Sequence, residues 1–128
     1  MSSKPLAQKL AIKPGQRVRL LRAPQEVELM LGGLSQGAAV TRTTGVADVI
    51  LIFVQDRAEL ETHLPALKTD LAPGGMIWVC YHKGAKGSVT DINRDDIAAY
   101  VETIGMRAVS QVAVDADWSA LRLKVVDR

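Results

Sequence analysis

The residues best suited to chemistry come directly after two apolar, strand-like runs of the sequence. Arg22 follows the first run, and Gln55 and Asp56 follow the second. In open parallel sheets, ligands bind beyond the carboxyl ends of the strands, so these side chains would line one crevice if the two strands are neighbours. Because a guanidinium is a planar double donor for carboxylate or phosphate, we expect Arg22 to hold a small anion there. The alternatives are a solvated strand end, or an ion pair of Arg22 with Asp56 or Glu26.

A second candidate anion site is the loop over residues 82–88, which follows an apolar strand and precedes a helix. Its polar side chains are His82, Lys83, Lys86 and Ser88. Backbone N–H groups in such a loop could bind an anion together with the two lysines. The residue order differs from the Gly-Lys-Ser/Thr of a phosphate-binding P-loop, and the alternative is a solvated loop. The sequence places no Ser or Cys nucleophile beside His82, so we predict no catalytic residue.

The two histidines and the single cysteine argue against other kinds of site. His63 and His82 are too far apart in the sequence to form a metal-ligand cluster with Cys80, and we expect neither a metal nor another cofactor. One cysteine permits no internal disulfide, which favours a reducing cytoplasm. No apolar run reaches the roughly 18–20 residues of a membrane helix. The first residues also lack the apolar segment of a signal peptide.

These candidate residues depend on a sheet whose central strand is predicted over residues 46–54. Both faces of this run are apolar and rich in β-branched residues, which is typical of a parallel strand covered on both sides. The other predicted strands cover residues 17–21, 38–43, 76–81, 106–114 and 118–126. The last two alternate in polarity and predict an antiparallel hairpin. Pro73-Gly74-Gly75 predicts a turn before the strand at residue 76.

Helices are predicted between these strands. They cover residues 5–12 and 25–31, the stretch after Asp56, and the stretch from Thr90 or Asp91 to Gly105. Asp56 and Glu59 form a capping pattern, and at Pro65 we expect a kink or a tight start to a second helical segment. The apolar stripe of that helix consists of Leu60, Leu64, Leu67 and Leu71. We therefore expect one α/β domain over residues 1–128, a three-layer Rossmann-like sandwich with a mostly parallel sheet of about six strands and a C-terminal antiparallel hairpin.

The net charge of +2 is unevenly distributed along the chain. Residues 1–44 carry seven Lys/Arg against two Glu, a net +5, and residues 45–128 carry nine against twelve acids, a net −3. The basic part could bind nucleic acid weakly through Lys9, Lys13, Arg17, Arg19 and Arg42. Nucleic-acid modules usually carry a denser basic face and a known motif, so nucleic acid is not the expected partner.

The chain from Ala47 onward resembles the second half of class I S-adenosylmethionine-dependent methyltransferases. The similarity covers about two-thirds of the chain, and its most specific sign is Leu-Ala-Pro-Gly-Gly at residues 71–75 before an apolar strand. The first half departs from that family, because residues 20–24 lack the glycine-rich cofactor turn and no acid ends the strand at residues 38–43. One strand–helix unit is also missing before the central strand. The whole pattern, from residues 6–16 to residues 117–122, resembles a family of short, uncharacterised bacterial proteins with a Rossmann-like fold.

These observations predict a non-catalytic domain that binds a small ligand or a protein and lacks the glycine-rich cofactor turn. A small anion and a second copy of the chain in a homodimer are the expected partners, without a membrane. The first alternative is a reduced S-adenosylmethionine-dependent methyltransferase, which the resemblance implies. The second alternative is weak nucleic-acid binding through the basic N-terminal part.

Overall fold

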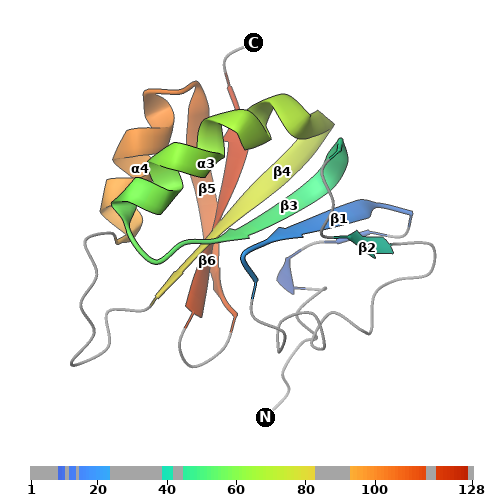
Figure 1. The fold of residues 1–128 in the computed structure, drawn as a ribbon, viewed down its shortest axis with the longest axis horizontal. Helices are drawn as coiled ribbons and strands as arrows, with labels where there is room; N and C mark the ends of the chain where they lie inside the picture. The colour runs from blue at the N-terminus through green and yellow to red at the C-terminus, as the bar shows by residue number, and fades with distance from the viewer. Residues whose placement is uncertain are drawn as a thin grey trace.

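The computed structural model describes residues 9–10, 12–13, 15–23, 39–41, 45–82, 93–114 and 118–126. Within these ranges the chain forms a mixed sheet with two helices on one of its faces (Figure 1). The strands are β1 (Arg17–Leu21), β2 (Ala39–Thr41), β3 (Ala47–Phe53), β4 (Leu71–His82), β5 (Met106–Ala113) and β6 (Trp118–Val125). The helices are α3 (Arg57–Asp70) and α4 (Arg94–Glu102).

The strand order in the sheet is β2-β1-β3-β4-β6-β5. The first four strands in this order are parallel, whereas β6 runs antiparallel to both β4 and β5. The predicted α/β class and the C-terminal hairpin are confirmed. The sheet is mixed, however, and its parallel part ends at β4. The hairpin connection at residues 115–117 lies outside the described residues.

The predicted central strand is confirmed as β3, between β1 and β4. Its side chains alternate between the two hydrophobic cores of the domain. Val49, Leu51 and Phe53 belong to one core, and Ile50 and Ile52 belong to the other. All five are buried, which explains why the sequence of this strand is apolar on both faces.

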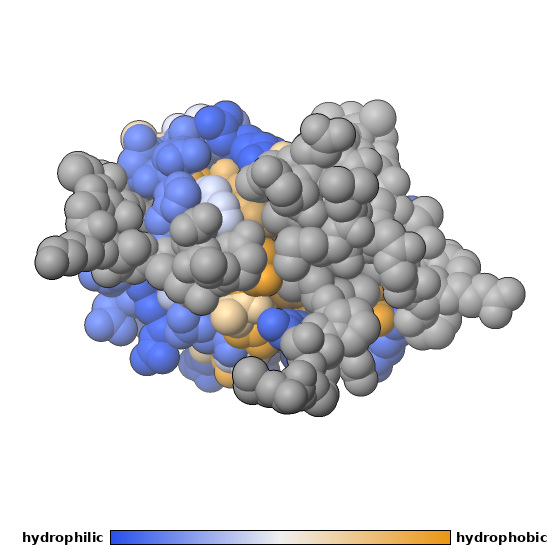
Figure 2. All heavy atoms as spheres, turned by 90° about the horizontal axis from the view of Figure 1, so that it is seen from below, coloured by the Kyte–Doolittle hydropathy of each residue, from blue (hydrophilic) through white to orange (hydrophobic). Residues whose placement is uncertain are grey.

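The two cores lie on opposite faces of the sheet. One is covered by α3 and α4, whose buried residues are Leu60, Leu64, Leu67, Ile97 and Val101. The other is covered in part by Leu10 and Ile12, and the indole N–H of Trp78 donates to the Leu10 carbonyl over 3.1 Å. Seen from below, apolar residues occupy the middle of the described surface and hydrophilic residues lie toward its outer parts (Figure 2). Most of the helix predicted at residues 5–12, and all of that at 25–31, lies outside the described residues.

Helix α3 begins as the sequence predicts. The Asp56 carboxylate accepts from the backbone N–H of Glu59 at 2.9 Å, and the Glu59 carboxylate accepts from the backbone N–H of Gln55 at 2.7 Å. The second helical segment expected at Pro65 is wrong, because α3 continues as one helix to Asp70, and the alternative of a kink stays a prediction. An exposed proline removes a single backbone donor here, which does not divide the helix.

Helix α4 begins later than predicted. Its N-cap is Asn93, whose side-chain oxygen accepts from the backbone N–H of Asp96 at 2.9 Å. The expected caps, Thr90 and Asp91, lie outside the described residues, and neither is the cap of this helix. Asn is as good an N-cap as Asp, so the cap could not be chosen by residue type alone.

The predicted Pro-Gly-Gly turn is wrong, because residues 72–75 are a bulge inside β4. Leu71 pairs with Ala47 and Met76 pairs with Val49, so four residues of β4 stand opposite Asp48 alone. Gly74 has φ +77°, and a Cβ on Gly75 would lie 2.6 Å from the Asp48 carbonyl oxygen. Both glycines are therefore needed for this shape, which we call the β4 bulge. Pro73-Gly74-Gly75 correctly indicated an irregular backbone, but the strand continues through these residues.

No helix in the described ranges has the length and apolar character needed to cross a membrane.

Candidate functional site

The predicted crevice at the carboxyl ends of the strands brings together part of the predicted site. Strands β1 and β3 are neighbours, with Leu20 opposite Leu51, so Arg22 lies at the same edge as Gln55 and Asp56. Arg22 has φ +59°, a left-handed conformation that is uncommon for a residue with a side chain. This edge of the sheet is called the carboxyl edge below.

The Arg22 side chain is bound to a carboxylate of the domain itself. Its Nη2 atom donates to Oε2 of Glu59 at 2.8 Å, a partner that the sequence did not suggest. Of the two carboxylates that the sequence did suggest, Glu26 lies outside the described residues. Asp56 is engaged in capping α3. An anion entering this crevice would therefore compete with Glu59 for Arg22.

His82 lies at the carboxyl end of β4 and packs against an aromatic pair. Its ring stacks on Trp118 with centroids 4.0 Å apart, and Phe53 meets the same indole edge-on at 4.9 Å. The His82 ring therefore packs against aromatic side chains, and its part in an anion site stays a prediction. Lys83, Lys86 and Ser88 lie outside the described residues, so their place in an anion site stays a prediction.

Three basic residues near the N-terminus are engaged within the domain. Arg17 pairs with Asp48, and the buried Arg19 (7% exposed) donates to Asp70 at 2.9 Å. Lys9 donates to the backbone carbonyl of Ala113 at 3.3 Å. Three of the basic side chains proposed for nucleic-acid binding therefore already contact other residues of the domain. Arg42 lies outside the described residues.

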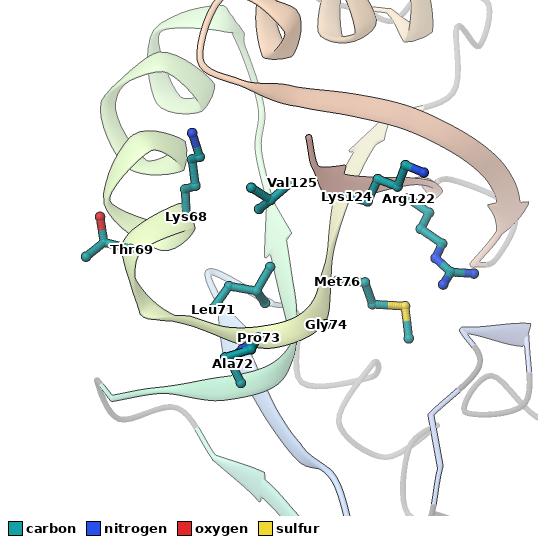
Figure 3. A pocket seen from close by; sticks show the side chains of 11 residues that line it. Lys68, Thr69, Leu71, Ala72, Pro73, Gly74, Met76, Arg122, Lys124 and Val125 are labelled. Carbon is teal, nitrogen blue, oxygen red and sulfur yellow. The ribbon is translucent and has the colours of Figure 1, made fainter. Parts of the chain in front are cut away.

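A pocket of about 570 Å³ lies at the opposite edge of the sheet, where the parallel strands begin. We call it the amino-edge pocket (Figure 3). Its walls come from the end of α3, the β4 bulge and the end of β6, and its lining residues are Lys68, Thr69, Leu71, Ala72, Pro73, Gly74, Gly75, Met76, Arg122, Lys124 and Val125. The sequence did not predict this pocket.

The amino-edge pocket exists because two strands separate. Pairing of β4 with β6 begins only at Ile77 and Leu123, and the β4 bulge precedes that point. Lys124 and Val125 continue their pairing with β5 alone. A smaller hollow beside it shares Arg122 and Met76 and adds Lys13, Gln16 and Asp48.

The charged side chains that line the amino-edge pocket are all cations among the residues that the structure describes. Lys68 is held in place, because its Nζ donates to the Ile104 carbonyl at 2.7 Å. Arg122 has a buried Nε atom without a hydrogen-bond partner. Lys124 is exposed. The arrangement suits the binding of a negatively charged group.

Metal binding has no structural support in the described part of the chain. No group of three or more His, Cys, Asp or Glu side chains there could hold a metal ion. Cys80 is buried in β4, as its apolar neighbours predicted.

Comparison with solved structures places the fold among methyltransferases. The ribosomal protein L11 methylase of Lactobacillus delbrueckii subsp. bulgaricus matches with a TM-score of 0.64 and 12% identity, over 95% of this chain and 75% of that chain. A structure described as a DhpI–SAH complex matches with a TM-score of 0.63 and 11% identity, over 97% of this chain and 83% of that one. These identities are low and show the fold alone.

The mitomycin 7-O-methyltransferase MmcR matches with a TM-score of 0.58 and 15% identity, over 94% of this chain and 53% of that chain. This chain therefore spans about half the length of that enzyme. No curated protein matches the chain in sequence. One sequence family matches residues 7–127, nearly the whole chain, and the chain belongs to it: the family described as "Protein of unknown function (DUF3052)".

Proposed function

We propose that this domain binds a small ligand without catalysing a reaction on it. The observation that carries the proposal is the composition of the amino-edge pocket. Its volume of about 570 Å³ falls within the range of about 300–1,000 Å³ that is usual for small-molecule sites. Among the described residues, its lining holds cations, apolar residues and one threonine but no His, Cys, Asp or Glu. Acid–base catalysis needs a positioned proton donor or acceptor, most often His but also Asp, Glu, Lys, Tyr or Cys, and of these types the described lining holds only lysines.

The carboxyl edge supports the same proposal. The class I methyltransferases that the chain resembles hold S-adenosylmethionine at a glycine-rich turn after the first strand, where the backbone must approach the cofactor. Here that turn contains Arg22 in a left-handed conformation, bound to Glu59 at 2.8 Å. The Arg22–Glu59 pair lies where those methyltransferases need an open backbone for the cofactor. We infer that S-adenosylmethionine is not the ligand of this domain.

Binding measurements with S-adenosylmethionine and S-adenosylhomocysteine test the proposal. We expect no change in melting temperature and no calorimetric heat at millimolar ligand, because a ligand that binds only the folded state would stabilise it. A second arm incubates the protein with small molecules that do stabilise it, and each should be recovered unchanged. Saturable binding of S-adenosylhomocysteine, or methyl transfer to an added acceptor, would contradict the proposal and favour a reduced methyltransferase.

A protein partner, including a second copy of the chain, is a second candidate. Strand β5 is the last strand of the sheet, and Val109 on it is 43% exposed. An edge strand offers unpaired backbone groups to another chain. Sedimentation over a range of concentrations tests the homodimer: a concentration-dependent dimer that a Val109→Lys substitution abolishes would support it. A monomer at all concentrations would exclude it.

A further inference from the structure

We propose that the amino-edge pocket binds an organic anion, a carboxylate or a phosphate ester with an apolar body, and that Arg122 contacts the anionic group. This inference deepens the proposed function and rests on it. It places the ligand at the edge of the sheet opposite to the crevice that the sequence indicated.

The charges around the pocket favour an anion. Lys68, Arg122 and Lys124 line it, and none of the described lining residues is acidic. Among the described residues, the carboxylate in the adjoining hollow belongs to Asp48, and it accepts from the backbone N–H of Arg17 at 2.8 Å. The Arg17 guanidinium also lies 3.6 Å from it. Asp48 is thus neutralised by another residue and leaves the positive charge of the pocket in place.

Arg122 is the residue with an unmet hydrogen-bonding need. Its Nε atom is buried and has no partner, and no hydrogen bond or ion pair joins its side chain to another residue of the described ranges. Arg19 also has a buried Nε without a partner, but its Nη1 is bound to Asp70. Buried polar groups in proteins nearly always have a partner, which may be a ligand oxygen or water. A carboxylate or phosphate would give Arg122 two oxygen acceptors in the plane of its guanidinium.

The rest of the lining suits an apolar body beside the anion. Leu71, Pro73, Met76 and Val125 supply apolar surface, and Figure 3 shows Met76 and Arg122 extending in the same direction from β4 and β6. Met76 belongs to one core, whereas Leu71 and Val125 pack against the core on the opposite face of the sheet. Met76 is therefore the apolar side chain on the same side as Arg122. A free inorganic ion would contact the cation but would not need the apolar side chains.

The β4 bulge makes this pocket a fixed part of the fold. Gly75 packs so closely that a Cβ would lie 2.6 Å from one backbone oxygen and 2.9 Å from another. Bulges occur frequently next to functional sites, where they change the direction of the strand and of its side chains. Here the bulge holds the wall of the pocket away from β6.

Isothermal titration calorimetry of the full chain with three probes tests the inference. Phenyl phosphate and benzoate carry the anion and an apolar ring, and benzamide is the neutral match of benzoate. We expect saturable binding of at least one anionic probe at low salt, and about tenfold weaker binding, or none, for benzamide. The preferred anionic probe distinguishes a phosphate ester from a carboxylate.

Arg122→Gln should weaken the bound probe about tenfold, because it removes the charge and one of the paired donors. Arg94→Gln removes the same charge from an exposed position on α4, outside this pocket, and should change the affinity less than about twofold. Lys124→Gln is the second pocket variant, to be used if Arg122→Gln does not fold, and it should also weaken binding.

No binding of phenyl phosphate or benzoate at millimolar concentration would overturn the inference. Equal affinities of Arg122→Gln and Arg94→Gln for the anionic probe would also overturn it. Equal binding of benzoate and benzamide would overturn it too. These outcomes would not contradict the proposed function, which is the binding of a small ligand without catalysis, but the ligand would be of another kind. Binding of S-adenosylhomocysteine, in contrast, would overturn the proposed function itself.

Discussion

The guanidinium of Arg22 donates to the carboxylate of Glu59 at 2.8 Å and so joins the end of β1 to the first turn of α3. Glu59 also accepts the backbone N–H of Gln55, so one carboxylate fixes two segments. The arginine that looked most suited to an anion at the carboxyl edge is thereby bound inside the domain. This relationship is one basis of our proposal that S-adenosylmethionine is not the ligand of this domain.

Substitution of Arg22 should show that its backbone is strained. Arg22→Ala loses the ion pair and keeps a Cβ at φ +59°, whereas Arg22→Gly loses the same pair without that penalty. We expect Arg22→Ala to be less stable than Arg22→Gly by about 1 kcal/mol in urea unfolding. Equal stability of the two variants would mean that the left-handed conformation costs nothing here.

The two glycines of the β4 bulge should respond differently to alanine. At Gly75 a Cβ meets two backbone oxygens, at 2.6 and 2.9 Å, and backbone atoms cannot move aside easily. We expect Gly75→Ala to destabilise the domain by about 2 kcal/mol or more. Gly74→Ala has open space around it and only a positive φ, so about 1 kcal/mol is expected. Chemical denaturation of both variants measures the order, and the reverse order would contradict the geometry of the bulge.

The ion pair between Arg19 and Asp70 should stabilise the fold more than a surface pair does. Asp70→Asn leaves the buried Arg19 without its counter-charge, and we expect a loss of about 1 kcal/mol, reduced by the 37% exposure of Asp70. Glu61→Gln breaks the exposed pair with Arg57 and should cost less than about 0.5 kcal/mol. Thermal unfolding of both variants gives the comparison, and equal losses would show that the burial of Arg19 is unimportant.

Stability should fall at alkaline pH, in part because of Tyr81. Burial raises the pKa of Tyr81 above its usual value of 10.0, against smaller opposing effects that include the positive charge of Arg94. The unfolded chain then loses this proton at lower pH than the folded chain, so the contribution is complete below pH 10.0 and is lost as the pH rises through the folded pKa.

Tyr81→Phe should therefore reduce the loss of unfolding free energy above pH 10.0. The substitution also removes the hydrogen bond that Gln111 donates to the phenol oxygen. Denaturant midpoints below and above pH 10.0 measure the effect. Tyr100, whose pKa is raised first by burial and then by Glu61, should leave a residual pH dependence in the variant. An unchanged slope in Tyr81→Phe would contradict the prediction.

Features that depend on neighbouring residues in the chain were predictable from the sequence. β3 followed from a run that is apolar on both faces, and α3 followed from Asp56 and Glu59 three positions apart. The C-terminal hairpin followed from its alternating pattern. In each case the local pattern and the tertiary contacts favour the same structure.

Features that depend on distant contacts were not predictable. The partner of Arg22 lies 37 positions away, and closer carboxylates were equally plausible from the sequence. The amino-edge pocket forms between the β4 bulge and Arg122, two segments that meet only because β4 pairs with β6. The signals available in the sequence were the adjacent glycines at 74 and 75 and the arginine at 122 within a largely apolar strand.

Amide N–H spectra of the isotope-labelled chain, titrated with phenyl phosphate and separately with S-adenosylhomocysteine, test the central claim most directly. The account predicts saturable shifts from phenyl phosphate at Gly74, Gly75 and Lys124, around the amino-edge pocket, and none from S-adenosylhomocysteine. Saturable shifts from S-adenosylhomocysteine at Arg22 and Gln55, with no response at the β4 bulge to either compound, would contradict it.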